Sequence, residues 1–279
     1  MSASSNDLAG FVVAWNISGS PRYEQVKDSL RNAGLKEEYA KELSNRNGFS
    51  RVCKQLKKER AIDKVEEKDG KIVFQFTRRH LEEAKKEFKY DYECRLTLDI
   101  TTGEIECREN EVLRQYAERK LSECLAVRTS QDITRLLQRM FAENADLFPL
   151  VPAKGVAYFV PIRHRLFSAR VSMFLRSIGG ELYHWPVPKG TMNGDRAVRD
   201  AINRGLTEMI ETVTKKSSEW SDSTRMTTME KALEEWNVIK FKCQSYKEYL
   251  GEAIGGLESA LESAKEAITK KIDAACSAA

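Results

Sequence analysis

The sequence contains no long apolar run. No stretch approaches the roughly 18 consecutive apolar residues that a membrane-spanning helix requires, and residues 1–10 lack the basic start and apolar block of a secretory signal. We therefore expect a cytoplasmic protein that does not contact a membrane. The 279 residues are 41% hydrophobic and 32% charged, which is typical of a folded globular chain that buries a sizeable core.

Histidine is scarce and the cysteines are dispersed. The three histidines, His80, His164 and His184, are far apart, and no two of the six cysteines have the Cys-x-x-Cys spacing of a zinc or redox site. We expect no metal and no cofactor, and we interpret the cysteines as free buried thiols. His164 lies between two arginines with no carboxylate nearby in sequence, which makes it a poor candidate for acid–base catalysis.

The sequence also lacks the common catalytic motifs. It contains no phosphate-binding loop, dinucleotide fingerprint, nucleophile elbow or zinc-protease motif. The segment from Gly190 to Asp195 leads into a helix whose amides offer an anion site, but we interpret it as an ordinary loop capped by Asp195. We therefore expect a binding protein rather than an enzyme. An enzyme assembled from dispersed residues is the open alternative, and a phosphate bound at this loop would favour it.

The order of the hydrophobic patterns predicts an α+β fold in three blocks, residues 1–109, 110–192 and 193–279. In the first block a strand is followed by three short helices and two antiparallel hairpins, which turn at Asp69-Gly70 and Thr102-Gly103. This order is that of a winged helix. The middle block has two helices and then a β-α-β order starting at Val156, for which we expect a small mixed sheet.

The last block contains no proline and is predicted to be almost wholly helical. Its final part has apolar residues at the spacing of a coiled-coil seam. Either an antiparallel helical hairpin of the same chain covers this seam, or a second copy covers it and makes a homo-oligomer. The residues that we assign to the seam are Leu250, Ile254, Leu257, Leu261 and Ile268.

The segment from Arg46 to Arg60 carries an excess of positive charge, with six basic residues against Glu59. Phe49, Val52 and Leu56 repeat at helical spacing, so the opposite side of the helix presents cations that can meet phosphates. The hairpin that follows would be the wing. The residues that we predict to contact nucleic acid are Arg46, Arg51, Lys54, Lys57, Lys58, Arg60, Lys68, Lys71, Arg78 and Arg79.

The predominance of lysine among these basic residues indicates how a nucleic acid would be bound. Because lysine predominates, we expect contacts that hold the backbone of DNA or RNA rather than read its bases. The rival hypothesis is that the same scaffold binds a protein partner, since winged helices also serve as protein-contact modules. A basic helical face that only faces solvent is the third interpretation.

Three segments resemble those of uncharacterised families found in bacteria and their phages or plasmids. They are VAYFVP at residues 156–161, GTMNGDR at residues 190–196 and LTLDITTG at residues 96–103. The resemblance implies a mobile-element or host-conflict setting, where nucleic-acid binding and protein sequestration are both common, and it assigns no reaction and no functional residue. The sequence thus leads us to expect a non-enzymatic, nucleic-acid-binding and assembly protein, with an oligomeric adaptor or inhibitor as the alternative.

Overall fold

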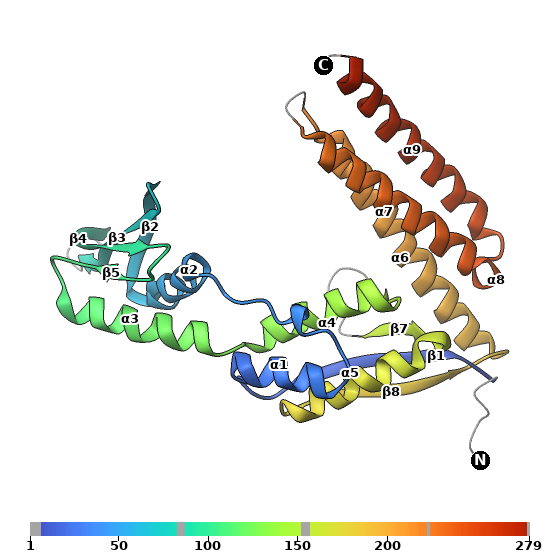
Figure 1. The fold of residues 1–279 in the computed structure, drawn as a ribbon, viewed down its shortest axis with the longest axis horizontal. Helices are drawn as coiled ribbons and strands as arrows, with labels where there is room; N and C mark the ends of the chain where they lie inside the picture. Colours follow the sequence, from blue (N-terminus) through green and yellow to red (C-terminus); the bar gives the residue numbers. More distant parts are fainter. Residues whose placement is uncertain (1–6, 83–86, 152–156, 222–223, 278–279) are drawn as a thin grey trace. The chain divides into compact units, whose positions relative to one another are not determined.

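The chain folds into helices and two separate β-sheets, as the α+β prediction requires (Figure 1). The structure is a computed structural model that describes residues 7–82, 87–151, 157–221 and 224–277. Contacts divide the chain into two compact units: unit 1 comprises residues 1–16, 138–172 and 181–279, and unit 2 comprises residues 17–137 and 173–180. This division differs from the three consecutive blocks expected, because the first strand of the chain pairs with a strand from its middle.

Unit 2 contains a four-stranded antiparallel sheet. Its first hairpin turns at Asp69 and Gly70, with φ of 52° and 74°, which are the left-handed conformations that this dipeptide tolerates. Gly103, with φ of 81°, lies in the turn of the second hairpin. The strands lie in the order β2 (Arg60–Lys68), β3 (Lys71–Glu82), β4 (Glu87–Asp99) and β5 (Ile105–Glu106).

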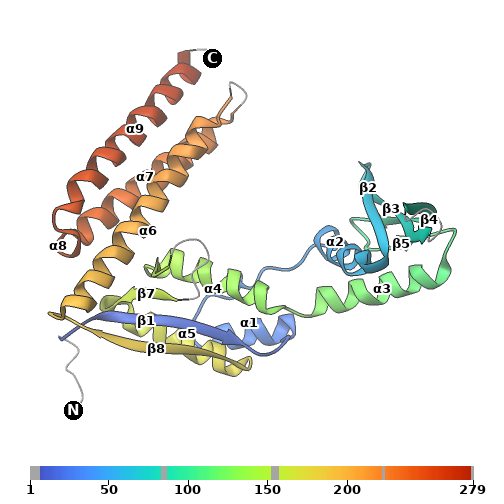
Figure 2. The ribbon, with the colours of Figure 1, turned by 180° about the vertical axis from the view of Figure 1, so that it is seen from behind.

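Two helices, α2 (Asn45–Gln55) and α3 (Glu111–Ala126), pack with this sheet in one hydrophobic core (Figure 2). Within the described residues, α1 (Tyr23–Asn32) adds no side chain to that core, and the second predicted helix is a single 3-10 turn, η2 (Glu37–Tyr39). The described residues therefore do not confirm the three-helix arrangement of a winged helix. Helix α2 packs against α3 and, through the rings of Phe49 and Phe74, contacts the sheet.

An irregularity in β4 changes which residues face the core. Phe76 pairs with Cys94, but the next residue of β3, Thr77, pairs with Tyr92, so Glu93 is an extra residue in the strand. Strict alternation along residues 92–100 predicts Tyr92 and Cys94 on one face of the strand, together with Leu96 and Leu98. In the structure Cys94 is buried and Tyr92 is exposed, because the bulge moves Tyr92 to the opposite face of the sheet.

Unit 1 contains the second sheet. Gly10 allows close pairing, because a Cβ atom there would lie 2.2 Å from the carbonyl oxygen of Val160. The β-α-β segment does not make the mixed sheet that was expected, because β1 lies between β7 and β8 and pairs with β7 in the antiparallel sense. Val156, the predicted start of β7, lies outside the described residues. The strand order is β6 (Phe148–Pro149), β7 (Tyr158–Pro161), β1 (Leu8–Ile17) and β8 (Gly180–Pro188).

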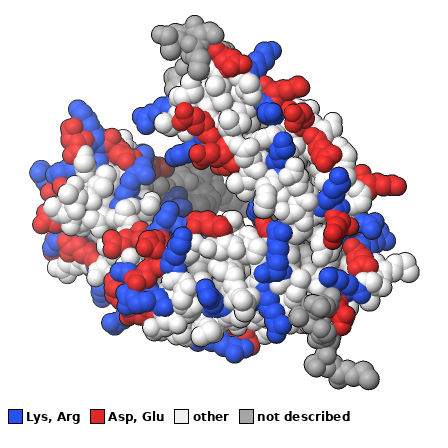
Figure 3. Space-filling model, turned by 45° about the vertical axis from the view of Figure 1, so that its right-hand side comes forward, with Lys and Arg blue, Asp and Glu red and all other residues white. Residues whose placement is uncertain are grey.

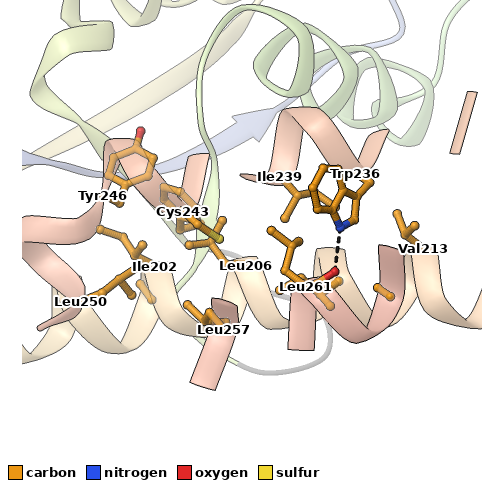
Figure 4. Packing of buried hydrophobic residues seen from close by; sticks show 14 of the residues in the cluster. Ile202, Leu206, Val213, Trp236, Ile239, Cys243, Tyr246, Leu250, Leu257 and Leu261 are labelled. Atoms are coloured by element: carbon orange, nitrogen blue, oxygen red, sulfur yellow. Dashed lines mark hydrogen bonds between the residues drawn. The ribbon is translucent and has the colours of Figure 1, made fainter. Parts of the chain in front are cut away.

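The C-terminal region forms a bundle of long helices that lie side by side in both ribbon views (Figures 1 and 2). Its apolar side chains share one core with the sheet of unit 1. The Trp236 indole N–H donates a hydrogen bond of 2.7 Å to the carbonyl oxygen of Leu261 in this core (Figure 4). The helices are α6 (Met192–Ser218), α7 (Met226–Ser245), the short α8 (Lys247–Leu250) and α9 (Ala253–Ser277).

The seam residues lie in the interior of this bundle. Leu250, Leu257, Leu261 and Ile268 are buried, and Ile254 is half-buried against the same core. Helices α6 and α7 of the same chain pack against α9, so an interface between copies would need a different surface. No described helix combines the length and the apolar character that crossing a membrane requires.

We predict that Leu261→Ala lowers the free energy of unfolding by about 2–5 kcal/mol, because the truncation leaves a cavity in the bundle core. Urea denaturation followed by circular dichroism measures the change. The control is Val238→Ala on α7, where the side chain is 53% exposed and the loss should stay within about 0.5 kcal/mol. Equal losses in the two variants would contradict the packing described.

Candidate functional site

The basic segment from Arg46 to Arg60 is predicted as one helix, but α2 ends at Gln55 and the segment continues through a 3-10 turn into the start of β2. Ser44 caps the helix by accepting a hydrogen bond of 3.4 Å from the backbone N–H of Asn47. The Asn45 side chain donates to the carbonyl oxygen of Ile100 at 3.1 Å, which fixes the start of the helix against the β4–β5 turn. Phe49 and Val52 are fully buried, so the basic side chains lie on the other faces of the helix.

The arginines of this segment bind carboxylates of their own unit. Each donates two hydrogen bonds to one acidic side chain, the bidentate geometry in which arginine binds carboxylates most strongly. The pairs are Arg46 with Glu67 at 2.8 and 2.9 Å, Arg51 with Asp132 at 2.5 and 2.7 Å, and Arg60 with Glu93 at 2.6 and 3.0 Å.

The pair of Arg51 and Asp132 joins α2 to the start of α4 (Ser130–Asn144). Burial alone would raise the pKa of Asp132, but hydrogen bonds from Arg51 and Thr129 outweigh it and lower that pKa to about 2. The guanidinium of Arg51 is only partly exposed. The pair therefore supports the structure of unit 2, and its charges largely cancel.

Two lysines keep their charge exposed. Lys54, on the last turn of α2, and Lys57, on the 3-10 turn η3 (Leu56–Glu59), are exposed and form no ion pair among the described residues. We call Lys54 and Lys57 the α2 lysines. Arg78 on β3 is likewise exposed and has no carboxylate within ion-pair distance in the described chain.

The remaining predicted contacts are weaker or lie outside the described side chains. Lys68 lies 3.9 Å from Asp69, and Lys71 lies 3.7 Å from Glu106. The side chains of Lys58 and Arg79 are outside the described part of the chain. In Figure 3 basic and acidic side chains are interspersed over the visible face. Among the described side chains, fewer predicted contact residues are therefore free of a carboxylate partner than the sequence alone suggested.

A buried charge cluster in unit 1 was not predicted. Asp146, between α4 and β6, is almost completely buried, and its carboxylate accepts from several groups. Arg163 donates at 2.7 Å, Lys242 at 2.7 Å and the Tyr246 hydroxyl at 2.5 Å, and the His164 Nε2 atom lies 3.0 Å away. We call these five residues the Asp146 cluster. It joins the loop after α4 to η4 (Ile162–His164) and to the end of α7.

In this cluster two basic side chains, Arg163 and Lys242, contact one carboxylate. Burial alone would raise the pKa of Asp146, but hydrogen bonds from His164, Lys242 and Tyr246 outweigh it and hold that pKa well below its usual value. Burial and the bond to Asp146 raise the pKa of Tyr246. The carboxylate is therefore saturated with donors and stays ionised, which suits a structural tie rather than a proton-transfer group.

The carboxylate missing near His164 in sequence is thus supplied by a residue 18 positions away. Lys242 and Tyr246 lie still further along the chain, about 100 residues from Asp146. No local spacing connects these positions. Only the pairing of the sheet and the packing of the bundle bring them together.

A serine and a histidine form a second contact that sequence analysis did not predict. Ser168 Oγ on α5 (Arg165–Ser177) lies 2.7 Å from His184 Nε2 on β8, and the ring of Phe11 meets the His184 ring edge to face. This is the distance of a nucleophile and its base. Ser168 is 1% exposed, however, so no substrate reaches its hydroxyl, and the contact ties α5 to β8.

The glycine-rich loop before α6 is closed by its own aspartate. The helix begins at Met192, and its N-cap is Thr191, four residues before the predicted cap Asp195. Asp195 lies in the first turn and accepts a hydrogen bond of 3.2 Å from the backbone N–H of Gly190. A carboxylate therefore already occupies the position that a bound phosphate would take.

The described cysteines are free thiols. Cys53, Cys94, Cys107 and Cys243 are buried, as predicted, and Cys124 is half-buried. Burial raises the pKa of Cys53 and of Cys94 to about 12, which makes these thiols unreactive near neutral pH. Cys276 lies where side chains are not described.

We predict that Asp146→Asn lowers the free energy of unfolding by about 3 kcal/mol at neutral pH, because it leaves Lys242 and Arg163 without their counter-charge. The folded-state pKa of Asp146 is lowered, so its stabilisation is complete above the unfolded pKa of about 3.9 and is lost as the pH falls below it. The difference in the free energy of unfolding between wild type and variant should therefore decrease in acid. Denaturant titrations at several pH values measure it.

The control is Asp200→Asn, which removes an exposed carboxylate that lies 3.8 Å from Arg196. That variant should lose less than about 1 kcal/mol at any pH. If the gap between wild type and Asp146→Asn grew as the pH fell, the description of this cluster would be wrong.

Comparison with known proteins gives a family and no relative with a described activity. No curated protein and no solved structure matches the chain. One family model matches residues 8–275, which is nearly the whole sequence and spans both units. The chain therefore belongs to the family described as "Family of unknown function (DUF6744)".

Proposed function

We propose that this protein is a non-enzymatic binding protein that holds a nucleic-acid backbone on the α2 lysines. One observation carries the proposal: Lys54 and Lys57 are exposed at the end of α2 without an acidic partner among the described residues, while the neighbouring arginines are held by carboxylates. Arg78 on the adjacent hairpin adds a third exposed cation.

The paired arginines and the α2 lysines have different roles in this proposal. Bidentate pairs fix α2 and the hairpin in place, which keeps the lysines at a constant position. Lysine ammonium groups contact phosphates as point charges and do not discriminate between bases. The expected binding is therefore weak, independent of sequence and sensitive to salt. A phage, plasmid or host-conflict setting is part of the proposal and agrees with such a role.

The proposal keeps assembly as a separate property. Because the seam of α9 is covered within the chain, assembly into oligomers would use another surface.

The alternative function is an adaptor or inhibitor that binds only proteins. The internal ion pairs of Arg46, Arg51 and Arg60 favour this alternative, since they reduce the charge available to phosphates.

We predict that the salt dependence of DNA binding reports about three phosphate contacts. A plot of log affinity against log salt should have a slope of about −2.7 on B-DNA, because each neutralised phosphate contributes about −0.9. Lys54→Glu/Lys57→Glu should reduce the slope to about −0.9, since only Arg78 then remains. Fluorescence anisotropy with a labelled duplex measures both values.

The matched control is Lys215→Glu/Lys270→Glu, which makes the same charge change at two exposed lysines of the helical bundle. This control should bind DNA like the wild type. Absence of binding at low salt, or equal losses in the two double variants, would reject the nucleic-acid proposal and leave the protein-binding alternative.

A further inference from the structure

The sheet of unit 2 has a second face, opposite to the core. Side chains on this face follow from the register: Val73 pairs with Thr97, Gln75 with Arg95, and Thr77 with Tyr92, and none of these six is buried. The core of unit 2 uses the alternating residues, such as Ile72, Phe76 and Leu96. We call the surface that carries Val73, Gln75, Thr77, Tyr92, Arg95 and Thr97 the outer face.

Two exposed tyrosines extend the outer face along β4. Tyr90 is 56% exposed and Tyr92 is 53% exposed, and the two-residue spacing of a strand places them on the same side. The Tyr92 hydroxyl donates a hydrogen bond of 2.5 Å to Glu109, which fixes the ring beside a carboxylate. Exposed tyrosines on a rigid strand are costly to solvate and are enriched where proteins bind partners.

Carboxylates outnumber cations on the described part of the outer face. Asp63 pairs with Gln75, Glu66 with Val73, and Glu106 with Thr97, so each projects to this side of the sheet. Glu109 joins them through Tyr92. The described cations are Arg95, which bonds to Gln75, Lys71, which lies near Glu106, and Lys68, which pairs with Lys71 and lies 3.9 Å from Asp69. An acidic surface on a chain with a net charge of +4 is a local feature rather than a reflection of composition.

We propose that the outer face binds a cationic segment of another protein. The rings of Tyr90 and Tyr92 offer faces on which an arginine or lysine side chain stacks. Glu109 lies beside Tyr92, and Asp63 and Glu66 add opposite charge further along the same face, which steers a basic partner to this surface. The same charges repel phosphates, so the outer face and the α2 lysines take ligands of opposite sign.

The test measures binding of a basic probe to the full chain. The probe is a fluorescent peptide in which arginine alternates with serine, and its partner probe carries glutamate in place of arginine. The arginine peptide should bind, with an affinity that falls as salt rises, and the glutamate peptide should not. Tyr90→Ala/Tyr92→Ala should weaken binding about tenfold, which corresponds to about 1.4 kcal/mol for two cation–π contacts.

Conservative variants distinguish the loss of an aromatic ring from a disruption of the sheet. Tyr90→Phe/Tyr92→Phe keeps both rings and should bind within about twofold of the wild type. Asp63→Asn/Glu66→Gln should weaken binding and flatten its salt dependence. Circular dichroism of each variant shows that the sheet is intact, and a variant with a changed spectrum is replaced by the corresponding single substitution.

The control variant is Tyr183→Ala/Trp185→Ala, which removes another pair of exposed aromatic rings, stacked on β8. It should bind the arginine peptide like the wild type. The inference is overturned if the arginine peptide does not bind, if both aromatic variants lose it equally, or if Tyr90→Ala/Tyr92→Ala instead reduces the mass of a self-associated chain.

This inference and the proposed function can fail separately. Lys54→Glu/Lys57→Glu removes the α2 lysines and should leave binding of the arginine peptide unchanged or slightly stronger. Tyr90→Ala/Tyr92→Ala should leave DNA binding unchanged. Loss of both activities in either variant would contradict the assignment of two independent faces.

Discussion

The buried carboxylate of Asp146 is the constraint on which unit 1 depends. An ion in an apolar interior is tolerated only where opposite charge and hydrogen-bond donors surround it. Here the donors come from η4 and from the end of α7, so the sheet and the helical bundle have to meet in one arrangement. Apolar side chains could slide past one another at lower cost, but the carboxylate can be satisfied at this point alone. The cluster thus specifies how the bundle joins the sheet.

In unit 2, ion pairs determine which charged side chains remain unpaired on the surface. The bidentate pairs of Arg46, Arg51 and Arg60 neutralise most of the basic segment. What stays exposed is cationic at the end of α2 and acidic, with two tyrosines, on the outer face of the sheet. Our proposals assign a different kind of partner to each of these two surfaces.

Local patterns predicted most of the secondary structure. Asp69-Gly70 fixed a hairpin because both residues adopt positive φ, and the apolar stripe of α4 fixed a helix, since such signals depend on residues close in sequence. The second helix of the first block became a 3-10 turn, and Tyr92 changed face at a bulge. Both errors occurred where tertiary contacts decide between local alternatives that the sequence leaves nearly equal.

The candidate site was predictable only in part, for the same reason. Its helix and its lysines were found from spacing, but Glu67, Asp132 and Glu93 could not be identified as partners of the arginines, because these pairs span 21 to 81 residues. No sequence pattern predicted the Asp146 cluster, because its members come from segments that are far apart in sequence and form no motif with their neighbours. The winged-helix prediction was based on the order of helices and strands along the chain, and that order does not determine which of them pack together.

The path of the chain has a consequence for synthesis. Strand β1 is made first, yet its partner β7 follows only after all of residues 17–137. At about 5–20 residues per second, a ribosome needs on the order of ten seconds to make that insertion. During this time an apolar strand waits without a neighbour while unit 2 can already fold. The unpaired strand is open to aggregation for that time, and slower translation would lengthen the exposure.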